Sequence, residues 1–296
     1  MKKLYNKINE FWLRSRKWSN ENIFGYIVGA IVKLTFIIVF AVLLYSVLPT
    51  NEEDLFISDS GEQKDCNVTG INLHGELKTY LPLHAENDTY FKYDSVSSED
   101  ITGKIKIANN NPDIKAIIIE VDSPGGSIVA GEEIDTVIKN SEKPVIALIR
   151  DLGASASLWA ISSADRIYAS ENSTIGSIGV TSSFMSNAKK NAKDGITYEA
   201  LSSGKFKDSG SPEKELTTEE RTLILRDINI SFNNFIKALS LNRNIDIETV
   251  KSNADGSTWL GTKAKEIGII DEIGSLIDVE RYIEQETNEK PEICWE

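Results

Sequence analysis

The sequence is poor in the residues that build metal centres and disulfide scaffolds. Its 296 residues include two cysteines, Cys66 and Cys294, and two histidines, His74 and His84. A disulfide-rich fold needs more cysteines than this, and a Cys/His metal site needs them clustered, so both classes are excluded. A single bridge between the two cysteines stays open, because it depends on whether the domain lies in an oxidising compartment.

Positive charge is scarce beyond the first twenty residues. The whole chain carries a net charge of −13, whereas residues 1–20 hold six basic residues and one acidic residue, a local charge of +5. The remainder therefore carries −18. Such a surface repels the phosphates of nucleic acids, so we expect no nucleic-acid partner.

Long apolar runs are also rare, and the one that stands out is residues 23–48, IFGYIVGAIVKLTFIIVFAVLLYSVL. It is long enough to cross a bilayer as a helix, and its single charge, Lys33, can reach the nearer interface. Basic residues precede it and acidic residues follow, which predicts a cytoplasmic N-terminus. We predict an uncleaved signal anchor at residues 23–48; a buried core helix and a cleaved signal peptide are the alternatives. Residues 1–22 would be a basic cytoplasmic leader and residues 49–65 a polar spacer.

Beyond Cys66, short β-branched runs alternate with segments of helical spacing. A run apolar on both faces is typical of a strand in a parallel sheet, and a helix between two such runs indicates a crossover. We therefore predict an α/β fold with a parallel sheet and crossover helices. The expected strands are NVTGINLHG, IKAIIIEVD, KPVIALI and DRIYAS, and the expected crossover helix is IVAGEEIDTVIKN.

A longer helix is predicted further along the chain. Thr217 and Glu220 have the spacing of a capping box, which marks a helix start. The apolar residues that follow recur at helical spacing, so we expect them on one inward face. These are Leu225, Ile228, Phe232, Phe235, Ile236 and Leu239.

Two turns of small residues follow successive predicted strands. They are SPGG at residues 123–126 and DLGASAS at residues 151–157. Turns at this edge of an α/β sheet commonly bind ligands, and glycines let a substrate backbone come close. Ser155 would begin a helix, where free N–H groups can hold a developing oxyanion. Ordinary turns and tight helix packing are the competing interpretations.

A nucleophilic serine needs a base. His74 sits inside a predicted strand, where a lone histidine is more often structural. Both histidines lie far from the two turns in the sequence. A lysine can serve when burial favours its uncharged amine. Lys205 and Lys207 lie in the loop LSSGKFKDSGSP, although two lysines in a polar loop can also be simple solvated charges.

Six segments together resemble, in order, the motifs of the signal peptide peptidase A family. The resemblance runs from about Cys66 to about Ile277 and implies a membrane-anchored serine–lysine peptidase with a Clp-protease/crotonase-like fold. We therefore expect a serine peptidase domain at residues 66–285 and a C-terminal tail at residues 286–296. The segments are VDSPGG, GASASLWAISSADRIYA, STIGSIGV, SSGKFKD, ELTTEER and ADGSTWLGTKAKEIGIIDEIGS.

The resemblance also implies roles for single residues. Ser155 matches the nucleophile, and Lys207, 52 residues later, matches the general base. Ser177 matches the serine whose hydroxyl holds the lysine amine. The backbone N–H groups of Gly126 and Ala156 would form the oxyanion hole.

The sequence departs from the family pattern directly after the nucleophile. The family commonly has two glycines there, whereas this chain has Ala156 and Ser157. An oxyanion hole uses the amide, so alanine is acceptable, but these side chains would narrow the nearest substrate pocket. Ser157 is the minor alternative nucleophile, and Lys205 is the lysine most easily mistaken for the base.

The expected activity is hydrolysis of hydrophobic peptides, such as cleaved signal peptides, without metal or cofactor. The resemblance further implies a homo-oligomer in the bacterial inner membrane, with the bilayer contacted through residues 23–48 and the catalytic domain outside the cytoplasm. Two other functions share this fold class: a crotonase-like acyl-CoA enzyme and a catalytically inactive membrane scaffold.

Overall fold

A computed structural model describes residues 66–81 and 95–296 and, nearer the N-terminus, residues 7, 10, 27, 30–36 and 38. The chain divides into two compact units, Met1–Gln63 and Lys64–Glu296. The described residues of the first unit are helical. Most of the predicted anchor, leader and spacer lies outside the described residues. Within the described part, none of the helices combines the length and apolarity that a bilayer crossing requires.

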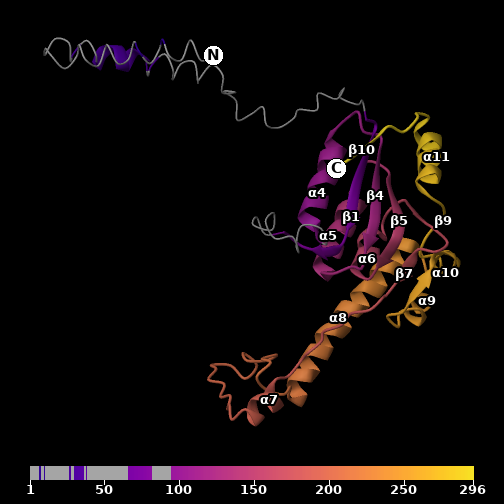
Figure 1. The fold of residues 1–296 in the computed structure, drawn as a ribbon. Coiled ribbons are helices and arrows are strands. Elements are labelled where there is room, and N and C mark those ends of the chain that lie inside the picture. Colours follow the sequence, from indigo (N-terminus) through magenta and orange to yellow (C-terminus); the bar gives the residue numbers. More distant parts are fainter. Residues whose placement is uncertain are drawn as a thin grey trace. The chain divides into compact units, whose positions relative to one another are not determined.

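The second unit is built on an eight-stranded sheet (Figure 1). Its strands are β1 (Val68–His74), β4 (Ala116–Ser123), β5 (Val145–Ala154), β6 (Arg166–Ala169), β7 (Thr174–Gly176), β8 (Thr258–Leu260), β9 (Glu272–Ile273) and β10 (Ile293–Trp295). The order is β10-β1-β4-β5-β6-β9, with β7 beside β5 and β8 beside β7. All pairs are parallel except β7 with β8. The predicted strands are confirmed, but the sheet is mixed rather than parallel, because β8 runs back along β7.

Helices cover both faces of this sheet. The described helices are α4 (Ser98–Asn110), α5 (Ile128–Lys139), α6 (Ala156–Ile161), α7 (Ala188–Lys193), α8 (Thr218–Arg243), α9 (Ile247–Ser252), α10 (Gly261–Ile267) and α11 (Leu276–Thr287). Two short parallel strands, β2 (Glu76–Lys78) and β3 (Ser95–Ser97), form a second sheet. The predicted crossover helix is α5, between β4 and β5.

Successive residues of the central strands enter two separate cores, as expected for strands buried on both faces. In β4, Ile117 and Ile119 face the larger core with α4, α5, α6 and the inner end of α8. Ile118 faces the smaller core, where Val279 and Ile283 of α11 pack. In the strand order, β4 and β5 lie in the middle of the sheet. The two small-residue turns begin at their carboxyl ends.

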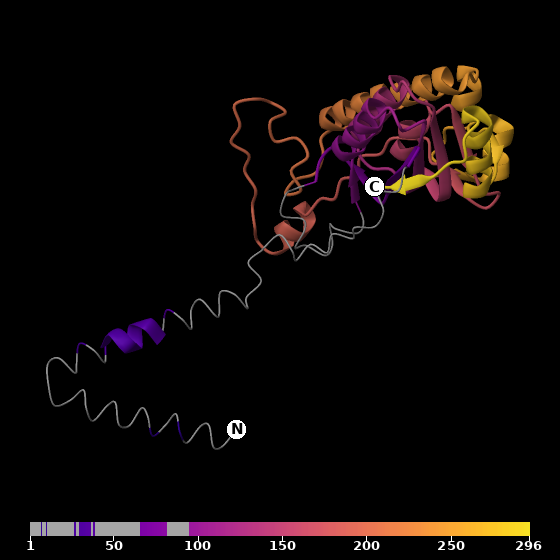
Figure 2. The same ribbon diagram turned by 90° about the horizontal axis from the view of Figure 1, so that it is seen from above.

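The helix α8 begins at the predicted capping box and ends at Arg243. Its inner residues Phe235, Ile236 and Leu239 are buried, but Leu225 is 50% exposed. The prediction that the whole stripe faces inward is wrong for this outer half, because the helix continues past the body of the domain. Figure 1 shows α8 and the segment before it extending away from the sheet, and Figure 2 shows the loop of that segment projecting beyond the body of the domain. We call residues 180–217, which include α7, the arm.

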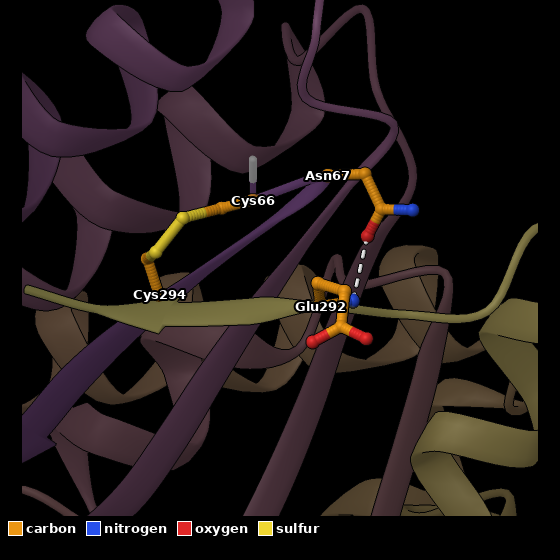
Figure 3. The surroundings of a disulfide bond; sticks show 4 residues. All are labelled: Cys66, Asn67, Glu292 and Cys294. Atoms are coloured by element: carbon orange, nitrogen blue, oxygen red, sulfur yellow. Dashed lines mark hydrogen bonds between the residues drawn. A yellow bond between two sulfur atoms is a disulfide. The ribbon is translucent and has the colours of Figure 1, made fainter. Parts of the chain in front are cut away.

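A disulfide joins the two ends of the second unit (Figure 3). Cys66, just before β1, is bonded to Cys294 in β10, across 228 residues. Asn67 Oδ1 accepts a hydrogen bond of 2.7 Å from the N–H of Glu292. Residues 286–296, which we expected to form a tail, thus contribute an edge strand to the main sheet.

Candidate active site

Ser155 occupies a strained turn between β5 and α6. Its φ of 55° and ψ of −127° are uncommon for any residue other than glycine. The turn is held by two backbone hydrogen bonds: the Ser155 N–H donates to Gly176 O at 2.9 Å, and the Ser155 carbonyl accepts from Trp159 N–H at 3.2 Å. The half-buried serine is thus placed at the carboxyl end of a central strand, the usual site position in α/β sheets.

The SPGG turn packs directly against Ser155. Gly125 has a φ of 91°, and a Cβ there would lie 2.7 Å from both Ala154 O and Ala156 N. No larger residue fits this contact, which explains a glycine at this position. The two turns therefore pack against each other at the carboxyl ends of β4 and β5.

Gly126 is held from the other side by β2. Leu77 N–H donates to Gly125 O, and Ser127 N–H donates to Leu77 O, both at 2.8 Å. A Cβ on Gly126, whose φ is 150°, would lie 2.2 Å from Leu77 O. The backbone of this turn is therefore fixed by its neighbours and is not free to readjust.

Two backbone donors at the turns have no acceptor. Within the residues that the structure describes, neither Gly126 N–H nor Ala156 N–H makes a hydrogen bond. Ala156 is the first residue of α6, and the first N–H groups of a helix lack intrahelical partners. The prediction that these two groups form an oxyanion hole is not tested by the single chain.

Ser157, the alternative nucleophile, has a structural role. Its side chain is fully buried. The hydroxyl lies 2.7 Å from Ala154 O and 3.0 Å from Ser123 O and accepts a hydrogen bond from Ala154 N–H at 3.0 Å. It joins the ends of β4 and β5 beneath the site, and no substrate can reach it. We missed this role in the sequence, where a serine among small residues signals buried hydrogen bonding as readily as catalysis.

Ser177 lies beside Ser155. β5 and β7 are parallel, with Ala154 opposite Gly176, so the next residue of each strand is Ser155 and Ser177. Neighbouring strands are about 4.8 Å apart. Ser177 also has a positive φ, 50°, and its N–H donates to Ser257 O at 2.7 Å. Two serines in unusual backbone conformations therefore meet at one edge of the sheet.

Lys207 lies on the arm between Lys205 and Lys214, which bind Glu219 and Glu220 at the outer start of α8, so the single chain does not bring it to Ser155. Figure 1 shows the arm around α7, at the end of α8 remote from the sheet. The Lys207 side chain is exposed, and its amine makes no hydrogen bond or ion pair with the described residues. Lys205, by contrast, pairs with Glu219 at 3.6 Å and lies over the Phe206 ring. The Lys205 amine is therefore already engaged by a carboxylate and a ring, whereas the Lys207 amine has neither contact among the described residues.

The histidine that the structure describes, His74, contacts a carboxylate. His74 Nε2 lies 3.2 Å from Glu120 Oε1, and Arg150 binds the other oxygen of Glu120 at 2.6 Å. His84 lies outside the described residues. No group of three or more His, Cys, Asp or Glu side chains in the described part is arranged to hold a metal ion.

Two family models match this chain. The model of peptidase family S49 matches residues 138–290, and the Clp protease model matches residues 89–185. The two matches together span the turns, the arm and the long helix. A mutant ClpP1 from Listeria monocytogenes aligns with a TM-score of 0.46 and 16% identity, over 70% of this chain and 91% of its own.

Several relatives are named as proteases. A candidate protease of Methanocaldococcus jannaschii is 30% identical over 89% of this chain and 84% of its own length. A candidate signal peptide peptidase SppA of Enterococcus faecium is 30% identical over 62% of this chain and 54% of its own, and Protease 4 of Haemophilus influenzae is 29% identical over 75% and 35%. The chain thus spans about half and about a third of these last two. From the family match, the relatives and the α/β architecture, the chain belongs to peptidase family S49 and is a serine-type protease of that family with a Clp-protease-like fold.

Proposed function

We propose that this protein is a membrane-anchored endopeptidase whose dyad is shared between two copies: Ser155 of one copy attacks the peptide, and Lys207 of a neighbour takes the serine proton. One observation carries the proposal. The strained turn at Ser155 is fully built, with free N–H groups beside it, whereas the arm holds Lys207 away from it within the same chain.

The proposed reaction is acyl transfer. Uncharged Lys207 accepts the hydroxyl proton as Ser155 Oγ attacks the scissile carbonyl, and the resulting ammonium protonates the leaving amine. The N–H groups of Gly126 and Ala156 bind the oxyanion, each contributing on the order of 3 kcal/mol. Ser177 would accept a hydrogen bond from the lysine amine. Water then releases the acyl-enzyme, with Lys207 again as base.

The exposed apolar residues of the arm support assembly into a homo-oligomer. Met185 and Leu201 on the arm are 86% and 88% exposed, and Leu225 and Ile230 on the outer half of α8 are 50% and 54% exposed. Exposed apolar residues that gather into one patch commonly mark an interaction surface. We propose that a second copy of the chain covers these apolar residues. Lys207 of the first copy would then complete the active site of the second.

The substrate and location follow from three features. The apolar run at residues 23–48 would hold the enzyme beside hydrophobic peptides in the membrane, such as cleaved signal peptides. The Cys66–Cys294 disulfide supports a catalytic domain outside the cytoplasm. The SPGG turn, which has no side chain at Gly125 or Gly126, would let an extended peptide come close and bind through main-chain hydrogen bonds.

Labelling with a fluorophosphonate tests the nucleophile. We expect the probe on Ser155, located by mass spectrometry, and none on the Ser155→Ala variant. Probe on another serine would contradict the proposal. Absence of labelling, together with absence of hydrolysis of a hydrophobic peptide, would favour an inactive scaffold; turnover of an acyl-CoA thioester would favour the crotonase-like alternative.

Two lysine variants test the base. Lys207→Ala is expected to lower peptide hydrolysis by about 10³-fold or more, because the dyad acts as a unit. Lys205→Ala is the matched control and should stay within about twofold, since that lysine is bound to Glu219. Co-expressing Ser155→Ala with Lys207→Ala separates a shared dyad from an internal one. Mixed assemblies should regain activity, and a mixture that stays inactive argues against sharing.

A further inference from the structure

The end of the arm contains a network of charged side chains next to Lys207. We propose that Lys214 is a positioning residue: it holds the carboxylate of Asp208 away from Lys207, so that the neighbouring amine is not bound in a standing ion pair. This inference rests on the proposed function, in which Lys207 is the base. It adds a second lysine to the reaction, one that touches neither substrate nor nucleophile.

Asp208 directly follows Lys207 and is turned into the arm. Its Oδ1 accepts a hydrogen bond of 2.7 Å from the Tyr198 hydroxyl. Its Oδ2 is buried and makes no hydrogen bond within the described residues, and the Lys214 amine lies 3.7 Å from it. The position of Asp208 thus depends on one hydroxyl and one cation.

Lys214 is in turn held by Glu220. Its amine donates a hydrogen bond to Glu220 Oε1, and the Glu220 side chain is 3% exposed. Glu220 Oε2 accepts from Thr217 N–H at 2.9 Å, within the capping box that begins α8. The hydrogen bond from Lys214 is the largest cause of a lowered pKa at Glu220, and the bond to Glu220 raises the pKa of Lys214. Both groups therefore stay charged at neutral pH.

The two carboxylates at the start of α8 are already bound to other groups. Glu219 is engaged by Lys205, and Glu220 is engaged by Lys214 and the helix start. Asp208 is the adjacent residue in the chain, and rotation of its side chain would bring its oxygens toward the Lys207 amine. An ion pair there would favour the ammonium and oppose its use as a base.

A purely structural role for Lys214 makes a different prediction. If the lysine only tethers the arm to α8, its loss lowers activity equally at every pH. If it neutralises Asp208, its loss moves the pH–rate profile to higher pH and leaves the maximal rate at alkaline pH largely intact. The two roles are therefore separated by the profile and not by the size of the loss at neutral pH.

The test measures the pH–rate profile of the full-length protein on a hydrophobic fluorogenic peptide. Lys214→Met should shift the rising limb to higher pH by about one unit, the effect of a nearby opposite charge. Adding Asp208→Asn should return the limb to the wild-type position, and Lys214→Arg should leave it there. Lys189→Met removes the same charge from an exposed position on α7 and is the matched control, with no shift expected.

Each result decides the matter. An unshifted profile in Lys214→Met, or a shift that Asp208→Asn does not reverse, overturns the inference. If Lys214→Met has no measurable activity, recovery in the double variant supports the inference and lack of recovery overturns it. The proposed function fails separately, through an active Lys207→Ala variant, whatever Lys214→Met shows.

Discussion

The body of the domain and the arm hold the two halves of the proposed dyad in opposite ways. Around Ser155, backbone contacts on two sides set the turn: Gly125 packs against Ala154 and Ala156, and Gly176 O accepts a hydrogen bond from the Ser155 N–H. Around Lys207, side chains are exposed and the local order comes from polar contacts such as Tyr198 with Asp208. The proposed nucleophile is preorganised by the fold, whereas the proposed base is exposed on a surface.

This difference connects assembly with activity. A preorganised nucleophile without its base is a weak catalyst, because an unassisted hydroxyl is a poor nucleophile. Association of copies would cover the apolar residues of the arm and deliver the lysine in the same event. Under the proposed function, activity is therefore a property of the assembly, although the serine turn is complete in each chain.

In the body of the domain, the largest loss of activity is expected from a substitution at Gly126. Gly126→Ala should lower kcat by about 10²–10³-fold, the effect of losing one oxyanion donor. The reason is steric: the added Cβ would lie 2.2 Å from Leu77 O, so the turn and its free N–H must move. The measurements are kcat on a hydrophobic peptide and the thermal midpoint of unfolding.

Gly103→Ala is the control for the same chemical change. Gly103 lies in α4 and a Cβ there meets nothing within 4 Å, so stability should rise by about 0.4–1 kcal/mol with activity unchanged. Wild-type kcat in Gly126→Ala would show that the turn is not a rigid part of the site.

The disulfide tests whether the body is stabilised independently of its site. Replacing both Cys66 and Cys294 with serine should lower the free energy of unfolding by about 2–5 kcal/mol, because the bridge closes nearly the whole domain. Activity should persist at low temperature. Cys66 precedes β1, and Ser155 follows the end of a strand in the same parallel set, so the two lie at opposite ends of the strands. Denaturant unfolding with and without a reductant measures the effect.

The variant in which Cys66 and Cys294 are replaced by serine and the reduced wild type should unfold at the same denaturant concentration. Equal stability of oxidised and reduced wild-type protein would show that β10 holds without the bridge. In that case the hydrogen bonds of Asn67 would contribute more than the disulfide to holding β10 against β1. Asn67 accepts from Glu292 N–H and donates to Lys290 O at 3.0 Å.

The body was largely predictable from the sequence because its patterns are local. β-branched runs buried on both faces identified β4 and β5, and small residues after each strand identified the turns around Ser155. The pairing of β8 with β7 was not predictable, since a three-residue strand has no periodicity to detect. The role of Ser157 was hidden for a similar reason: burial, not residue type, separates a structural from a catalytic hydroxyl.

The start of the long helix after the arm was predictable from the sequence, but the packing of that helix was not. The capping box at Thr217 and Glu220 marked the start of α8 correctly. The apolar stripe of α8 keeps one spacing along its length, so nothing in it signals that Phe235 is buried and Leu225 is exposed. Where a helix leaves its domain depends on the extent of the sheet, which the helix sequence does not encode.

The smallest expected effect concerns the pH range in which the arm stays ordered. The pKa of Glu220 is lowered, so its contribution to stability is present above about pH 4.5 and is lost as the pH falls through the folded value. The pKa of Lys214 is raised, so its contribution is present below about pH 10.5 and is lost as the pH rises through the folded value. The arm should therefore be most ordered between these limits.

Amide hydrogen exchange, expressed as protection factors, checks the acid side of this range. From pH 6 to pH 3, protection at the start of α8 should fall about two- to fivefold more than protection in β4, as expected for a partly exposed ion pair. The Glu220→Gln variant has no charge to lose at this position. Its protection at the start of α8 should therefore fall no more than its protection in β4, and should already be lower than in the wild type at pH 6. If the arm and β4 lose protection in parallel, the Lys214–Glu220 pair does not hold the arm, and the order around Lys207 comes from its contacts with the body or with a second copy.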